Sequence, residues 1–198
     1  MSGPSQERLG VLGGTFDPVH AAHVVVAVNV RAALRLDRVL LVVAGDPWQK
    51  HGEVAAAAPD RLALVEAAVE GIEGLEASPI EVEREGPTYT VDTLATLART
   101  GREMFLVVGA DVASRLETWR DVDRVRELAT LVIVERDGEA RARPPGRGWQ
   151  VERVTIPRLD ISSTDVRARL ARGAPIDGLV PARVVALIRD RGLYTADG

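Results

Sequence analysis

Short, nearly continuous apolar runs recur along this chain of 198 residues, and they constrain its fold more than any other feature. The clearest runs are residues 38–43, 104–108 and 130–135. Strands that are buried on both faces of a sheet have this pattern. Helix-like segments lie between the runs, at residues 21–36 and 90–100 among others. Strands that alternate with helices predict an α/β fold with a doubly wound parallel sheet.

The rest of the chain continues the alternation and shows no internal repeat. We expect further strands at 8–13, 75–83 and 151–156, further helices at 59–71, 163–172 and 181–190, and one or two short helices within 111–128. The length fits a single domain, residues 1–198, with a C-terminal helical part at about 160–194. In such a fold, ligands bind at the carboxyl ends of the strands, where the strand order reverses.

Composition excludes several classes of function. The chain has no cysteine, so it has no thiolate nucleophile and no Cys-ligated metal site. Its first ten residues lack the apolar core of a signal peptide, and no apolar run approaches the roughly 20 residues of a membrane helix. A net charge of −4 gives no general electrostatic reason to bind nucleic acid. We therefore expect a cytoplasmic protein without membrane or nucleic-acid partners, whose oligomeric state the sequence leaves open.

Residues 13–23 read GGTFDPVHAAH and directly follow an expected strand. Glycines there let backbone approach a phosphate closely, and Asp17 with Pro18 is a typical helix start, with Asp17 as N-cap. His20 and His23 are two of the three histidines and would share one face near the positive end of that helix. The segment therefore suits an anion. The plainer alternative is a glycine turn followed by two ordinary histidines.

A second polar segment, residues 161–167, reads ISSTDVR and follows the last expected strand. Ser162 with Asp165 three residues later forms a capping box, which could be its whole role. Three consecutive hydroxyls at a helix N-terminus also suit phosphate oxygens. Arg167 lies one turn further on, where its guanidinium could reach the same anion.

Both segments resemble the signatures of the adenylyl- and cytidylyltransferase superfamily, whose first motif usually ends in His-x-Gly-His. Ala22 stands where that family usually has glycine, whereas the second motif shows no departure. The resemblance implies a Rossmann-like nucleotidyltransferase fold in which both motifs bind the phosphates of ATP. The residues so implied are Gly13, Gly14, Thr15, Phe16, Asp17, His20, His23, Ser162, Ser163, Thr164 and Arg167.

The middle of the chain resembles one branch of this superfamily, the bacterial nicotinate-nucleotide adenylyltransferases. The resemblance rests on residues 45–50, 86–94 and 109–111, and on Trp119. It implies that Lys50 contacts phosphates and that Asp111 binds ribose hydroxyls. It also implies that Thr90 and the backbone near Trp119 receive the nicotinate carboxylate, and that Trp119 stacks on the pyridine ring. Each residue has a plainer alternative: a helix cap for Thr90 or Asp111, a packing aromatic for Trp119 and a solvated charge for Lys50.

The resemblance implies adenylyl transfer from ATP to nicotinate mononucleotide, with release of pyrophosphate, in NAD synthesis. His20, His23, Lys50 and Arg167 would be the catalytic residues, and no carboxylate pair is needed, because a phosphomonoester is already an anion at neutral pH. Mg²⁺ would bind mainly to phosphates and water, without protein metal ligands. The alternatives are a phosphopantetheine or nicotinamide-mononucleotide adenylyltransferase, or a non-catalytic nucleotide-binding protein.

Overall fold

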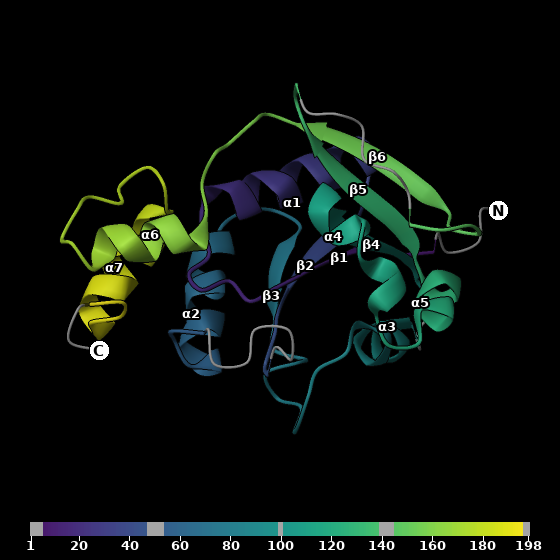
Figure 1. Ribbon diagram of the computed structural model, residues 1–198, viewed down its shortest axis with the longest axis horizontal. Helices are drawn as coiled ribbons and strands as arrows, with labels where there is room; N and C mark the ends of the chain where they lie inside the picture. The colour runs from purple at the N-terminus through teal and green to yellow at the C-terminus, as the bar shows by residue number, and fades with distance from the viewer. Residues whose placement is uncertain (1–5, 47–53, 99–100, 139–144, 196–198) are drawn as a thin grey trace. The chain divides into compact units, whose positions relative to one another are not determined.

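The computed structural model describes residues 6–46, 54–98, 101–138 and 145–195 (Figure 1). The strands form one six-stranded sheet in the order β3-β2-β1-β4-β5-β6. They are β1 (Arg8–Gly14), β2 (Arg38–Val43), β3 (Leu75–Ser78), β4 (Glu103–Gly109), β5 (Thr130–Arg136) and β6 (Val151–Ile156). This is the order of a doubly wound sheet, which reverses between β1 and β4. The predicted fold class is confirmed.

The helices also lie where the sequence predicts them. They are α1 (Ala21–Leu34), α2 (Ala58–Val69), α3 (Thr90–Ala98), α4 (Ala110–Ala113), the 3₁₀ turn η2 (Leu116–Thr118), α5 (Val122–Leu128), α6 (Ser163–Leu170) and α7 (Ala182–Arg191). One expected element is too long: β3 ends at Ser78 instead of continuing to residue 83. Pro79 follows it and has no N–H to donate to a ladder. The chain turns there, with the Glu83 N–H donating to the Pro79 carbonyl at 2.9 Å.

The chain divides into two compact units, each made of separate stretches of sequence. The first comprises Met1–Gly13, Val26–Leu40 and Tyr89–Arg158, and the second comprises Gly14–Val25, Leu41–Thr88 and Leu159–Gly198. The single domain expected over residues 1–198 stays a prediction.

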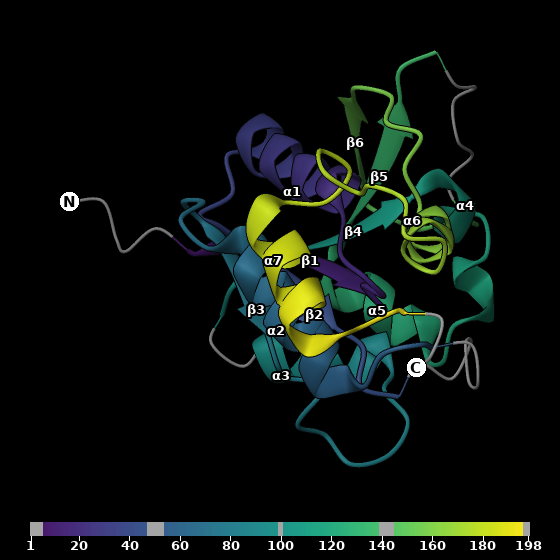
Figure 2. The same cartoon turned by 90° about the vertical axis from the view of Figure 1, so that its left-hand side faces the viewer.

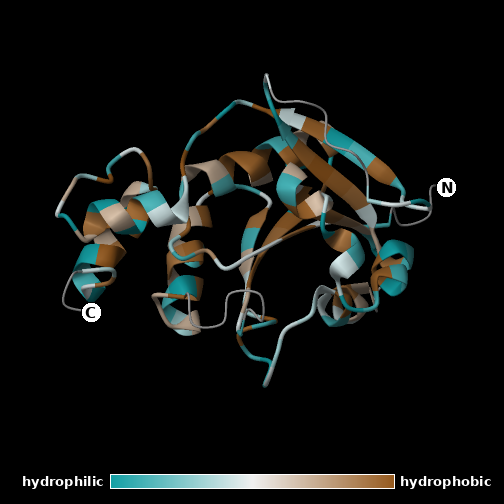
Figure 3. Cartoon of the chain, viewed as in Figure 1, coloured by the Kyte–Doolittle hydropathy of each residue, from teal (hydrophilic) through white to brown (hydrophobic). Residues whose placement is uncertain are grey.

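In the first unit, parallel strands carry the core. β1 pairs with β4, β4 with β5, and β5 with β6, all in parallel. Residues 131–134 of β5 are apolar and buried, whereas the edge strand β6 mixes apolar and polar residues along its length (Figure 3). Leu131 and Ile133 of β5 are fully buried, and α3 packs against α5. The apolar runs are thus strands covered on both faces, as the sequence indicates.

The second unit is built around α2, which packs against β3 and α7 (Figure 2). The buried side chains of α2 recur with helical spacing, at Arg61, Leu64, Val65, Ala68 and Val69. One of these five is an arginine, on a face that is otherwise apolar. The Arg191 guanidinium of α7 binds the Asp60 carboxylate, in the first turn of α2, at 2.7 Å.

Candidate active site

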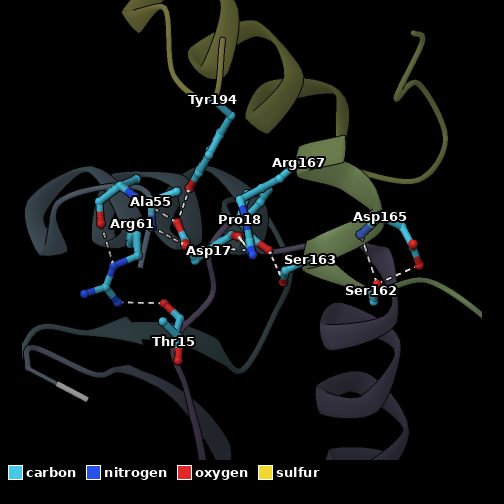
Figure 4. A network of polar contacts seen from close by, with 11 residues as sticks. Thr15, Asp17, Pro18, Ala55, Arg61, Ser162, Ser163, Asp165, Arg167 and Tyr194 are labelled. Carbon is cyan, nitrogen blue, oxygen red and sulfur yellow. Dashed lines mark hydrogen bonds and ion pairs between the residues drawn. The ribbon is translucent and has the colours of Figure 1, made fainter. Parts of the chain in front are cut away.

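Two segments about 150 residues apart in sequence meet in the second unit (Figure 4). The Ser163 hydroxyl donates to the Pro18 carbonyl at 2.9 Å. The Arg167 Nη1 donates to the Asp17 carbonyl at 2.6 Å. The two motifs that the sequence assigns to phosphate binding therefore lie side by side, and α6 holds the backbone of the first.

Asp17 lies at the centre of this arrangement and is only 3 % exposed. Its carboxylate accepts from the backbone N–H groups of Ala55 and Ala56, at 2.8 and 3.1 Å, and from the Tyr194 hydroxyl at 2.9 Å. The Arg167 Nη1 lies 3.7 Å from the same carboxylate. The prediction that Asp17 is the N-cap of the next helix is wrong. α1 begins only at Ala21, and the Asp17 carboxylate instead binds the backbone N–H groups of Ala55 and Ala56.

The loop before Asp17 has an unusual conformation. Phe16 has a left-handed backbone with φ 50°, and its ring is buried. A Cβ on Gly14 would lie 2.8 Å from that ring, so packing within the loop requires glycine there. A Cβ on Gly13 would meet nothing within 4 Å, which leaves space beside its backbone. The open side of Gly13 is compatible with the predicted phosphate contact.

His20 and His23 lie against each other, with ring centroids 3.7 Å apart and planes at 26°. His20 immediately precedes α1 and His23 lies in its first turn. The His20 backbone N–H donates to His23 Nδ1 at 3.2 Å, so the ring proton of a neutral His23 is on Nε2. The His20 ring is 5 % exposed, and within the described residues its Nδ1 has no hydrogen-bond partner. Burial lowers the pKa of His20 to about 4, so this imidazole is neutral at pH 7.

The hydroxyls of the second motif differ in what they contact. Ser162 is the N-cap of α6, accepting from the Asp165 N–H at 3.1 Å and donating to its carboxylate at 2.6 Å. The capping role predicted for Ser162 is confirmed. Ser163 is engaged with Pro18, whereas Thr164 is exposed. Phosphate binding by this motif stays a prediction, in which Thr164 is the hydroxyl most open to a ligand.

The residues predicted to hold the second substrate lie in the first unit. Thr90 is the first residue of α3, and Trp119 directly follows η2 and is half-buried. The Arg120 guanidinium lies 4.5 Å from the centroid of the Tyr89 ring. Because Tyr89 precedes Thr90 and Arg120 follows Trp119, this contact brings the two predicted segments together.

Asp111 is exposed in the first turn of α4, whose N-cap is Gly109. The alternative that Asp111 caps this helix is therefore wrong. Lys50 lies outside the described residues, so its predicted phosphate contact stays a prediction. Ala22 is half-buried in the first turn of α1.

Two residues of the second unit belong to the site although the sequence analysis did not select them. Arg61 is 1 % exposed and donates to the carbonyls of Thr15, Ala56 and Gly45 at 2.7, 3.1 and 3.2 Å. Its position in the sequence could have indicated burial, because Arg61 lies on the same face of α2 as the buried apolar residues. Tyr194, at the other end of the chain, reaches Asp17 and gave no local signal. Burial lowers the pKa of Arg61 and nearby Asp17 opposes this effect.

The described residues contain no group of three or more His, Cys, Asp or Glu side chains that could hold a metal ion. None of their helices is long and apolar enough to cross a membrane.

The family model described as "Cytidylyltransferase-like" matches residues 11–169, which include both motifs. This chain belongs to the cytidylyltransferase-like family. A curated relative from Roseiflexus sp. (strain RS-1), named probable nicotinate-nucleotide adenylyltransferase, is 43% identical over 197 residues. That alignment covers 96% of this chain and 99% of the relative. A second relative with the same name, from Streptomyces coelicolor, is 42% identical over 189 residues, covering 94% of this chain and all of its own.

Solved structures share the fold of this chain. The Plasmodium falciparum nicotinic acid mononucleotide adenylyltransferase, solved in complex with NaAD, superposes with a TM-score of 0.75 and 17% identity. The match covers 96% of this chain and 98% of that one. The Rossmann-like nucleotidyltransferase fold is thereby confirmed.

Proposed function

We propose that this protein transfers the adenylyl group of ATP to nicotinate mononucleotide, forming deamido-NAD and pyrophosphate. The observation that carries the proposal is the meeting of the two phosphate motifs through Arg167 and Ser163, in a chain with full-length relatives of that name. A phosphate oxygen of the mononucleotide forms a bond to the α-phosphorus of ATP. The bond from that phosphorus to the bridging oxygen breaks, and pyrophosphate leaves.

The proposed task of the protein is to hold two anions together and to stabilise the charge on the transferring group. Arg167 supplies the fixed positive charge, and the stacked imidazoles of His20 and His23 supply N–H donors. The nucleophile needs no general base, because the second pKa of a phosphomonoester is about 6. Lys50 is proposed to add a second cation.

Magnesium is proposed to bind through the phosphates of ATP and through water. The carboxylate nearest the motifs, Asp17, already accepts hydrogen bonds from Ala55, Ala56 and Tyr194, so it is poorly placed to serve as a metal ligand. A hard cation held by phosphate oxygens fits this donor set, because Mg²⁺ retains several waters and needs few protein ligands. When bound, it neutralises part of the triphosphate charge.

Acid specificity is proposed for the second substrate, at Thr90 and Trp119. A carboxylate only accepts hydrogen bonds, whereas an amide would direct its NH₂ group toward the same donors. The exposed Arg120 guanidinium, next to Trp119, supports a preference for a negative group. We expect kcat/KM for nicotinate mononucleotide to exceed that for nicotinamide mononucleotide by about 10- to 10³-fold.

The test is a competition assay with the full-length protein, ATP and Mg²⁺, offering both mononucleotides in one reaction. Deamido-NAD should dominate, with pyrophosphate released in equal amount. A parallel reaction with phosphopantetheine tests the other adenylyltransferase alternative. Dominant NAD would refute the acid specificity alone, and absence of transfer to all three acceptors would refute the enzyme assignment in favour of a non-catalytic role.

A further inference from the structure

The C-terminal segment reaches into the first phosphate motif through one hydroxyl (Figure 4). α7 ends at Arg191 and is capped by Gly192; the Tyr194 hydroxyl then donates to Asp17 Oδ1 at 2.9 Å, across 177 residues of sequence. Burial and the adjacent Asp17 carboxylate raise the pKa of Tyr194, so the phenol remains a proton donor throughout the physiological range. Nothing in the proposed adenylyl transfer by itself requires this contact.

The backbone of Tyr194 indicates that the contact is enforced. Its φ is 62°, a left-handed conformation that non-glycine residues seldom adopt and that surrounding contacts must maintain. The Arg191–Asp60 ion pair and the packing of α7 on α2 already hold the C-terminal helix in place. The Tyr194 hydroxyl therefore adds a link to Asp17 that the attachment of α7 does not need.

Asp17 divides its interactions between the tyrosine and the phosphate-site arginine. Its Oδ1 accepts from Tyr194 and Ala56, and its Oδ2 accepts from Ala55 and lies 3.7 Å from Arg167 Nη1. Without the hydroxyl, Oδ1 would keep one donor, and Arg167 would be the nearest cation able to compensate. An arginine drawn to a buried carboxylate is less available to an external anion.

We propose that Tyr194 is a positioning residue for ATP, acting through Asp17 on Arg167 and on the loop before Pro18. The inference rests on the proposed function, since it takes the bound anion to be the triphosphate. The Tyr194 hydroxyl donates a hydrogen bond to the Asp17 carboxylate. Arg167 therefore keeps its bond to the Asp17 carbonyl and directs its remaining donors toward phosphate. The C-terminal turn is thereby part of the phosphate site.

The test is Tyr194→Phe, which removes one oxygen and leaves the ring. We expect KM for ATP to rise about tenfold, the scale of losing one hydrogen bond to a charged group, while KM for nicotinate mononucleotide stays unchanged. Arg191→Gln is the matched control, because it cuts another contact of the same C-terminal segment without touching Asp17, and it should leave both constants unchanged. A purely structural role would lower the melting temperature and affect both substrates equally, which would overturn the proposal.

A second comparison tests whether the effect passes through the charge of Asp17. In an Asp17→Asn background, the added Tyr194→Phe change should alter KM for ATP less than about twofold, because coupled residues are not additive. A full tenfold effect in that background would refute the route through Asp17. Calorimetric titration with ATP alone should show the same pattern. Unchanged ATP affinity in Tyr194→Phe would refute this inference. Absence of transfer by the wild type in the competition assay would instead refute the proposed function.

Discussion

Mild acid should destabilise the folded protein through His20. Its ring is 5 % exposed, its Nδ1 lacks a partner within the described residues, and burial lowers its pKa from 6.5 to about 4. Between these two values the unfolded chain binds more protons than the folded one. The free energy of unfolding therefore falls as the pH drops from about 6.5 toward 4, and it is unaffected by His20 above that window.

The size of the effect follows from the two pKa values. At about 1.4 kcal/mol for each pKa unit, the loss is about 3 kcal/mol at pH 4 and is complete only below that pH. At pH 5 the linkage relation gives a loss of about 2 kcal/mol relative to pH 7.5. This is a large fraction of the stability of a typical domain, about 5–15 kcal/mol.

The assay is urea unfolding of the wild type and of His20→Asn at pH 7.5 and pH 5. Asparagine is polar and smaller, but it does not titrate, so its acid loss should be about 2 kcal/mol smaller than that of the wild type. Carboxylates such as Glu7, whose pKa is lowered by Arg38, also cost stability in acid but contribute equally to both proteins. An equal acid loss in the two proteins would show that His20 is not a buried neutral imidazole.

Protonation of the His20 imidazole should also depend on whether ATP is bound. A triphosphate beside the ring would favour the imidazolium and raise the pKa of His20. ATP binding near pH 5.5 should therefore take up a proton, which calorimetry detects as a heat that depends on the ionisation enthalpy of the buffer. Proton uptake that persists in His20→Asn would contradict a phosphate contact at this histidine.

Two further predictions concern His23 and Arg61. His23→Ala should lower kcat by about 10²–10³, the usual cost of losing one transition-state donor, with an unchanged unfolding free energy at pH 7.5; near-normal turnover would remove His23 from the mechanism. Arg61→Met should lower the free energy of unfolding, measured in urea, by at least about 3 kcal/mol, because the carbonyls of Thr15, Ala56 and Gly45 lose their charged donor. A change below about 1 kcal/mol would mean that these carbonyls find other partners.

The strands and helices were predictable because each leaves a local pattern in the sequence. The apolar runs at β2, β4 and β5 mark strands covered on both faces, and the glycine after α7 marks its end. The side-chain pattern predicts a strand to residue 83, but β3 ends at Ser78 because Pro79 has no N–H to donate to the ladder. The meeting of the two motifs was implied only by resemblance, since no local pattern states which loops touch.

The partner of Asp17 was the least predictable part of the site. Asp-Pro before a helix is a common N-cap pattern, and the sequence offers no sign that the carboxylate instead fastens Ala55, Ala56 and Tyr194. A contact across 177 residues depends on where α7 ends and how the chain turns at Gly192, which tertiary packing decides. A match to both motifs therefore predicts which residues face the phosphates, but not what holds them. In this chain, much of that support comes from an arginine on the buried face of α2 and a tyrosine after the last helix.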